Sequence, residues 1–267
     1  MDGLSLRRRI ALDIARSMRK SQEEEHPLRQ LFWECTLRCN LRCQHCGSDC
    51  KQVAATPDMP KEDFFKVLDS IAAKTDPHKV FVIISGGEPT MRADLEECGK
   101  GIYSRGFPWG MVTNGFGMTA ERFSRLLGAG LHSMTVSLDG LEENHDWLRG
   151  REGSFTRAAE TIRMAVRSGI AFDVVTCVNR RNYSQLPQLK EFLIGLGLKE
   201  WRLFSIFPQG RAALNPDLQL PPEMFRGMLD FIKETRKEGR IKASYGCEGF
   251  LGPYEGDVRD HFYSCQA

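Results

Sequence analysis

Five of the nine cysteines in this chain lie within sixteen residues, in the run CTLRCNLRCQHCGSDC at positions 35–50. Three of them, Cys39, Cys43 and Cys46, have the spacing C-x3-C-x2-C. Thiolate sulfur is a ligand for zinc and for iron–sulfur clusters, so this spacing predicts a metal centre. A thioredoxin-type redox pair at Cys43 and Cys46 is the alternative, but it leaves Cys39 without a role.

The number of thiols favours one kind of metal centre. Structural zinc takes four ligands, usually as two close pairs, and a second pair is missing here unless Cys35 or Cys50 joins. Ordinary ferredoxin clusters also take four thiolates. Three thiolates on a four-iron cluster would leave one iron open, and an open coordination position is where a metal site does chemistry. We therefore expect a four-iron cluster, with Cys35 and Cys50 as structural thiols.

The remaining cysteines have a simpler interpretation. Cys98 falls in a predicted helix and Cys177 in a predicted strand, where packing of a small apolar side chain explains them. A position of Cys177 facing a substrate is the minor alternative. Cys247 and Cys265, near the end of the sequence, are most simply buried thiols.

Composition limits the class of protein. A chain of 267 residues that is 41% hydrophobic can build one large domain with its own core. The balance of 37 basic and 35 acidic residues argues against a nucleic-acid surface. No apolar run resembles a signal peptide or a membrane span, so a cytoplasmic location is expected. Thiols stay reduced there, which favours metal or redox chemistry over disulfide bonds.

The elements that must position the cysteines follow a regular order. After an amphipathic helix within residues 1–29, which we expect to pack on its own domain rather than on a membrane, apolar runs alternate with amphipathic segments. This is the order of βα units. The predicted strands are Gln30–Trp33, Val80–Ile84, Gly110–Thr113, His132–Ser137, Ala171–Val178 and Trp201–Phe207. The predicted helices span residues 61–74, 94–105, 119–129, 154–168, 184–196 and 221–238, with Ser154 as an N-cap and Gly169 after a helix end.

Polar and glycine-rich segments follow these predicted strands. They are SGGEPT (85–90), TNG (113–115), SLDG (137–140) and FPQGRA (207–212), and the cysteine run follows the first strand. Six βα units fit either an open doubly wound sheet or a full or partial (β/α) barrel. Ligands gather at the carboxyl ends of the strands in both architectures, so these loops predict a single large site.

The combination of C-x3-C-x2-C, GGEP (86–89) and SLDG in this order resembles the radical S-adenosylmethionine (radical SAM) superfamily, over roughly residues 30–212. The resemblance implies a partial (β/α)6 TIM-like barrel, which we expect to span residues 30–240. It implies that Cys39, Cys43 and Cys46 ligate three irons of a [4Fe–4S] cluster, and that the amino and carboxylate groups of SAM chelate the fourth.

The resemblance also implies positions for SAM. His45 matches an aromatic position near the adenine, and Gly86, Gly87 and Glu88 match the motif that receives the amino group. Glycine lets backbone carbonyls approach an ammonium group closely. As an alternative, His45 is simply a loop histidine.

Further candidates lie at the fourth and later strands. Ser137 and Asp139 are placed to meet the ribose or the carboxylate, and Arg149 is a candidate for the carboxylate. The alternatives are a turn at Asp139 and a surface salt bridge at Arg149. Residues 174–178 and Phe207 would form apolar walls for adenine or substrate, although core packing explains them equally well. His145 is expected near the site.

The implied reaction is specific. A reduced cluster gives one electron to the sulfonium of SAM, the S–C5′ bond breaks, and the resulting 5′-deoxyadenosyl radical removes a hydrogen atom from a substrate. An electron donor such as flavodoxin or ferredoxin is implied as a partner.

The string SLDGLEENHDWLRG (137–150) resembles the branch of the superfamily that carries a C-terminal SPASM or twitch extension. The end of the chain, Cys265-Gln266-Ala267, resembles the start of that extension, so residues 241–267 are expected to be an incomplete part of it. Many members of this branch modify peptides or proteins, and such a substrate is our first expectation. The alternatives are a radical SAM enzyme acting on a small metabolite and a non-enzymatic iron–sulfur or zinc protein.

Overall fold

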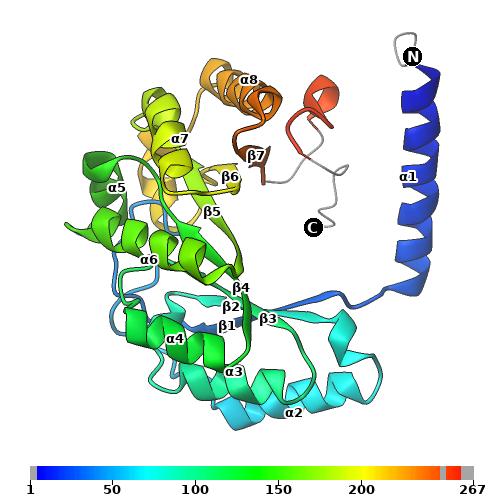
Figure 1. The fold of residues 1–267 in the computed structure, drawn as a ribbon, viewed down its shortest axis with the longest axis vertical. Helices are drawn as coiled ribbons and strands as arrows, with labels where there is room; N and C mark the ends of the chain where they lie inside the picture. The colour runs from blue at the N-terminus through cyan, green and yellow to red at the C-terminus, as the bar shows by residue number, and fades with distance from the viewer. Residues whose placement is uncertain (1–4, 247–250, 260–267) are drawn as a thin grey trace.

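The computed structural model describes residues 5–246 and 251–259. Its centre is a parallel sheet of seven strands whose spatial order is the chain order, β1 to β7 (Figure 1). Cys247 and Cys265 lie outside the described residues. The strands are β1 (Gln30–Thr36), β2 (Phe81–Gly86), β3 (Trp109–Thr113), β4 (Leu131–Ser137), β5 (Ala171–Val178), β6 (Glu200–Ser205) and β7 (Lys242–Tyr245).

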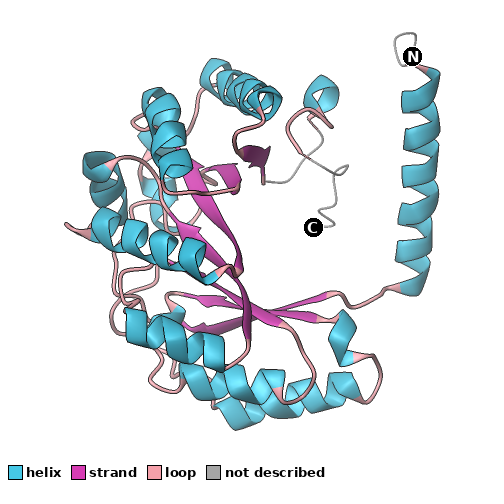
Figure 2. Ribbon diagram, viewed as in Figure 1, coloured by secondary structure: helices cyan, strands magenta, loops and turns pink. Residues whose placement is uncertain are grey.

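Helices connect successive strands and cover the outer face of the curved sheet (Figure 2). They are α2 (Lys61–Ala72), α3 (Leu95–Tyr103), α4 (Ala120–Gly128), α5 (Glu142–Arg149), α6 (Ser154–Ser168), α7 (Leu186–Gly195) and α8 (Pro222–Glu238). Each parallel pair needs such a crossover connection. The result confirms the predicted partial (β/α) barrel, with β1 and β7 at the two edges of the sheet.

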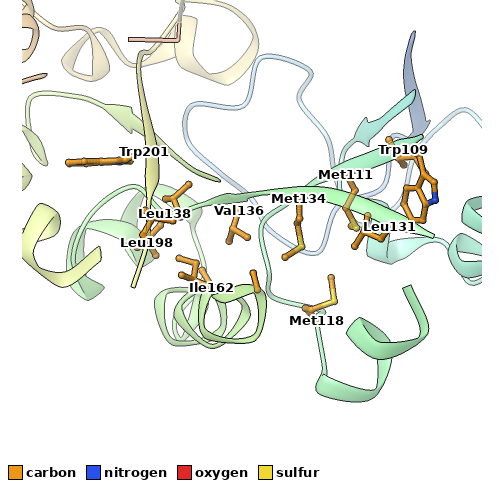
Figure 3. Packing of buried hydrophobic residues seen from close by; sticks show 14 of the residues in the cluster. Trp109, Met111, Met118, Leu131, Met134, Val136, Leu138, Ile162, Leu198 and Trp201 are labelled. Carbon is orange, nitrogen blue, oxygen red and sulfur yellow. The ribbon is translucent and has the colours of Figure 1, made fainter. Parts of the chain in front are cut away.

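Alternation along the strands separates the core from the barrel interior. In β5, Val174, Thr176 and Val178 are completely buried, whereas Val175 and Cys177 are partly exposed. The buried set packs with the outer helices, and Figure 3 shows Met134 and Val136 of β4 on the side of the sheet where Ile162 of α6 lies. The other set faces the interior, because successive side chains of a strand point to opposite faces.

The structure adds two elements to the predicted ones. Helix α5 and strand β7 were not predicted, and β7 continues the sheet past residue 240, the expected end of the barrel. The predicted N-cap at Ser154 is wrong, because Gly153 occupies that position. The carboxylate of Asp146 accepts hydrogen bonds there from Gly153 N, Ser154 Oγ and Phe155 N. Gly169 ends α6 with a φ of 71°, as predicted.

The predicted N-terminal helix is α1 (Leu6–Glu25), but its expected packing on the barrel is wrong. It stands apart from the barrel in Figure 1. Leu6, Ile10, Ile14 and Met18 on its apolar side are each more than half exposed. Across the described residues, no helix combines the length and the apolar character needed to cross a membrane.

Candidate functional site

The cysteine loop, residues 37–51, follows β1 at the carboxyl edge of the sheet. Backbone hydrogen bonds give this loop its shape. Cys39 N donates to Lys51 O at 2.7 Å, which closes the loop on itself. Gln44 N donates to Leu148 O at 2.8 Å, and Arg42 N donates to Arg149 O at 3.2 Å. These two bonds join the loop to the end of α5, so α5 helps to position the cysteines.

Arg211 holds the loop from the opposite side. Its backbone N–H donates to Cys46 O at 2.9 Å, and its guanidinium donates to Cys43 O at 2.7 Å and to Cys50 O at 3.0 Å. Cys43 and Cys50 are buried, and Cys46 is partly exposed. Three backbone carbonyls around the thiols are thus fixed by one residue from the loop after β6. Sequence reasoning missed this residue, although its segment FPQGRA was noted at the same edge.

A cavity of about 170 Å³ lies under the loop. It brings together most of the site residues predicted from the sequence. Its lining includes Cys39, Cys43, His45, Cys46, Gly86, Gly87, Glu88, Ser137 and Arg149. Cys50, Asn114 and Arg211, which were not predicted as site residues, line it too. Asp139 is not among its lining residues.

The GGEP motif needs its two glycines because its backbone lies very close to the backbone of Thr36 and Arg38. A Cβ atom on Gly86 would lie 2.2 Å from Thr36 O, and one on Gly87 would lie 2.3 Å from Arg38 O. Gly86 also has a φ of 124°, which side chains disfavour. Gly87 N donates to Thr36 O at 2.8 Å and Glu88 N to Arg38 O at 2.9 Å. The motif therefore extends the pairing of β1 and β2 into the cysteine loop. Its contact with the SAM amino group stays a prediction.

The carboxylate of Glu88 is hydrogen-bonded to other residues of the chain. Its carboxylate accepts hydrogen bonds from Thr90 N at 3.1 Å, Thr90 Oγ1 at 2.8 Å, Thr113 Oγ1 at 2.8 Å and Asn114 N at 2.8 Å. Burial raises the pKa of the Glu88 carboxyl, and these four donors oppose that rise. Glu88 thus ties the GGEP turn to the end of β3, and the backbone of the motif remains available at the cavity.

Arg149 and Asp139 form a buried ion pair, so the interpretation of Arg149 as a surface salt bridge is wrong. Arg149 Nε donates to Asp139 Oδ2 at 2.5 Å, and Cys177 N donates to Asp139 Oδ1 at 2.8 Å. Burial alone would raise the pKa of Asp139, but the guanidinium of Arg149 holds it below its usual value. Asp139 lies behind Arg149 and orients it.

Two of the three thiols that are predicted to bind the cluster receive hydrogen bonds from neighbouring side chains. Arg149 Nη1 donates to Cys43 Sγ at 3.7 Å. Asn114 Nδ2 donates to Cys39 Sγ at 3.8 Å and to Asn40 Oδ1 at 2.8 Å. Hydrogen bonds to ligand sulfurs help to set the reduction potential of an iron–sulfur cluster. This arrangement is therefore suited to an electron-transfer centre.

His45 and His145 are neutral histidines beside this ion pair. Burial lowers the pKa of each to about 4. His145 Nδ1 accepts a hydrogen bond from Asp139 N at 2.9 Å, so the expected nearness of His145 to the site is confirmed. His45 Nδ1 is buried and has no hydrogen-bond partner in the described part of the chain. An unpaired buried nitrogen at a cavity wall is available to a ligand.

The thiols and their surroundings fit the cluster and the cofactor. Burial raises the pKa of Cys39 to about 12 and also raises that of Cys43, so iron would replace protons on binding. Cys50 lies beside Cys46 in the same cavity wall, and its pKa is raised to about 11, chiefly by burial. Cys35 is completely buried in the main core, which confirms its structural role.

A second cavity of about 550 Å³ lies in the barrel interior and shares His45, Gly47, Val112 and Ser137 with the first. Val175, Cys177 and Phe207 line it, as predicted for apolar walls. The other members of the 174–178 segment face the helices, so that prediction was right only for alternate residues. Cys177 faces this interior, the position given as its minor alternative.

Comparison with known proteins agrees with this geometry. The model of the Radical SAM superfamily matches residues 33–193. The chain is 29% identical over 220 residues to an AdoMet-dependent heme synthase of Methanosarcina barkeri, covering 82% of this chain and 62% of that protein. It is 31% identical to an Fe-coproporphyrin III synthase of the same organism, with 78% and 51% covered. It is 26% identical to a PqqA peptide cyclase of Rhizobium meliloti, with 81% and 56% covered.

Solved structures share the fold. Streptococcus suis SuiB bound to S-adenosylmethionine superposes with a TM-score of 0.66 at 16% identity, covering 96% of this chain and 60% of that chain. Native anSMEcpe with bound AdoMet gives 0.68 at 18% identity, with 81% and 64% covered. The chain spans about half to three fifths of the length of these curated relatives. Together with the cysteine loop and the GGEP turn, the family match shows that the chain belongs to the radical SAM superfamily, whose members use a [4Fe–4S] cluster and SAM.

Proposed function

We propose that this chain carries the catalytic core of an enzyme that cleaves SAM reductively and removes hydrogen from a substrate in the barrel interior. One observation carries the proposal: three thiols, the GGEP backbone, Ser137 and Arg149 line a single cavity that adjoins the interior cavity. When bound, the cluster and SAM supply a one-electron cleavage that yields methionine and a 5′-deoxyadenosyl radical.

The residues of the chain would hold and orient these groups. Cys39, Cys43 and Cys46 would ligate three irons. Arg149 uses Nε for Asp139 and Nη1 for Cys43, which leaves Nη2 for the carboxylate of SAM. An arginine fixed in this way loses little freedom on binding a carboxylate.

The neutral ring of His45 would lie beside the adenine, since it lines both cavities. The backbone of Gly86 and Gly87 would receive the amino group of SAM. Ser137, which also lines both cavities, would meet the ribose or the carboxylate. The burial of Cys39, Cys43 and Cys50 and the contacts of Arg211 with the loop carbonyls would help to keep bulk water from the reactive centre.

For the substrate, we place a tetrapyrrole with carboxylate side chains first. Its support is that the relatives at 28–31% identity include proteins named as heme, Fe-coproporphyrin III and pre-heme d1 synthases. A peptide is the second candidate, since other relatives are named as PqqA peptide cyclases. The resemblance to the SPASM branch and a flavodoxin or ferredoxin donor stay predictions.

Anaerobic reconstitution tests the proposed reaction. Protein loaded with iron and sulfide, reduced with dithionite and given SAM should release 5′-deoxyadenosine and methionine in equal amounts, measured by liquid chromatography and mass spectrometry. A sample without dithionite is the control and should release neither. Bound zinc in place of iron, or intact SAM after reduction, would support a structural or electron-transfer protein instead.

A further inference from the structure

The interior of the barrel contains a fixed arginine. Arg202 lies on β6 between Trp201 and Leu203, which are completely buried against the helices. Alternation along the strand therefore turns Arg202 towards the interior. Its side chain is 40% exposed, so it can meet a molecule in that space.

Two neighbouring strands orient the Arg202 guanidinium. Nε and Nη2 donate to the carboxylate of Asp173 on β5, and Nη2 also donates to Thr135 Oγ1 on β4 at 3.1 Å. Thr135 Oγ1 donates in turn to Asp173 Oδ1 at 2.7 Å. Nη1 has no hydrogen-bond partner among the described residues. The guanidinium is thus held along one edge and has free donors on the other.

Arg202, but not its partner Asp173, lines the interior cavity. Arg202 is the only formally charged residue that lines the 550 Å³ cavity in the described part of the chain, and much of the remaining lining is apolar. Asp173 does not line this cavity; it lines a neighbouring cavity of about 630 Å³ towards the N-terminal ends of the strands, which Arg202 and Thr135 also line. A ligand in the 550 Å³ cavity would therefore meet the cationic face of the pair.

This donor lies close to the predicted SAM position. Thr135 and Ser137 are two residues apart on one face of β4, which corresponds to about 7 Å along a strand. Ser137 lines the cavity under the cysteine loop, and Thr135 bonds Arg202. A group bound by Arg202 would hold neighbouring atoms of the same molecule within reach of the SAM cavity.

We infer that Arg202 binds a carboxylate of the substrate, and that the substrate is a small molecule with an apolar body and carboxylate arms, such as a tetrapyrrole. The inference rests on the proposed function for its substrate class. The planar guanidinium suits a carboxylate, and the low polarity of the surrounding walls strengthens the pair. The apolar residues Val112, Val175, Phe204 and Phe207 would contact the body of the molecule.

Binding of iron coproporphyrin III and of its tetramethyl ester tests this role. Reconstituted protein with SAM is titrated anaerobically, and binding is followed by the Soret absorbance. Wild type should bind the free acid at least about tenfold more tightly than the ester, because the ester has no negative charge to pair with Arg202. Arg202→Gln should remove that preference, and Arg202→Lys should retain part of it.

Arg240→Gln is the matched control. Arg240 makes a similar pair with Glu191, but on the exposed surface, so this variant should bind both compounds as wild type does. If Arg202→Gln does not fold, as judged by circular dichroism, Arg202→Lys still decides, because it keeps the charge and loses the fork.

Equal affinity of wild type for acid and ester overturns the inference, as does unchanged preference in the Arg202 variants. A protein that binds a peptide but neither porphyrin overturns it as well. Cleavage of SAM by wild type without substrate is measured separately. Its absence refutes the proposed function, whereas its presence alongside unchanged porphyrin binding in the variants refutes the role of Arg202 alone.

Discussion

Arg149 connects three parts of the site through one side chain. Asp139 fixes its Nε, its Nη1 reaches Cys43 Sγ, and it lines the cavity under the cysteine loop. The burial of both charges requires a partner for each, and the pair provides it. Arg149 therefore connects the cavity under the cysteine loop to Cys43, one of the three predicted cluster ligands.

The hydrogen bond to Cys43 leads to a prediction about the reduction potential. Removing a donor from a ligand sulfur destabilises the reduced cluster, so Arg149→Gln should lower the potential. A difference of about 1 kcal/mol between the two redox states corresponds to about 40 mV for one electron. Potentiometric titration followed by electron paramagnetic resonance measures the shift. Arg240→Gln, far from the cluster, should leave the potential unchanged, and an unshifted Arg149→Gln would refute the tuning role.

The sequence supports the assignment of the three thiols but not their surroundings. The spacing of Cys39, Cys43 and Cys46 is a local pattern, so it can be recognised without a structure. The contact of Asn114 with Cys39 joins residues 75 positions apart, and no local pattern predicts it. The segment TNG was noted at the correct edge of the sheet, which was the only available signal for Asn114.

At the level of elements, the GGEP turn depends on the space beside β1. Gly87→Ala would place a methyl group 2.3 Å from Arg38 O, where the backbones of the turn and the cysteine loop are paired. Overpacking of this kind costs about 1–3 kcal/mol. We expect a lower thermal midpoint and weaker retention of iron, measured by circular dichroism and iron analysis.

Gly128→Ala is the control for this substitution. Nothing lies within 4 Å of a Cβ atom at Gly128, the last residue of α4, so the alanine should be tolerated. If both variants behave as wild type, the tight approach of the turn to the loop is not important for the site.

The predicted elements differ from the observed ones for physical reasons. Six strands were found near their true positions because their apolar runs face both helices and interior. Strand β7 has only four residues, Lys242–Tyr245, and its pairing with β6 decides its conformation. Helix α5 had usable signals, with Glu142 and Glu143 in the first turn and Gly150 in the left-handed region after its end. Those signals lie inside the motif string SLDGLEENHDWLRG (137–150).

At the level of the whole molecule, two neutral histidines, the buried His145 and the partly buried His45, couple stability to pH. The folded-state pKa values of His45 and His145 are about 4, below the ordinary value of 6.5. The unfolded chain therefore binds protons first as the pH falls. Stability from these residues is present above pH 6.5 and is lost towards pH 4, by up to about 1.4 kcal/mol per pH unit for each histidine.

Urea unfolding of the cluster-free protein at several pH values between these limits measures this loss. His145→Gln keeps an acceptor for Asp139 N and should reduce the slope by one proton. A variant of the exposed His132 should retain the slope of wild type. An unchanged slope in His145→Gln would mean that this histidine is not buried in its neutral form.

The candidate site residues of the partial barrel lie together at the carboxyl edge of the sheet. Five parts of the chain meet there: the cysteine loop after β1, the GGEP turn after β2, Asn114 after β3, Ser137 at the end of β4 and Arg211 after β6. Sequence order alone did not distinguish a barrel from an open doubly wound sheet. The choice depends on the curvature of the whole sheet, which the spatial order β1 to β7 with helices on one face produces.

The iron content of cysteine variants tests the central claim most directly, which is that three thiols hold a four-iron cluster with one iron left for SAM. Anaerobically reconstituted wild type and Cys50→Ala should each contain about four irons and four sulfides per chain. SAM should change the electron paramagnetic resonance spectrum of the reduced cluster in both. Cys39→Ala, Cys43→Ala and Cys46→Ala should each lose the cluster. A cluster that survives in any of these three, or that requires Cys50, would contradict the assignment.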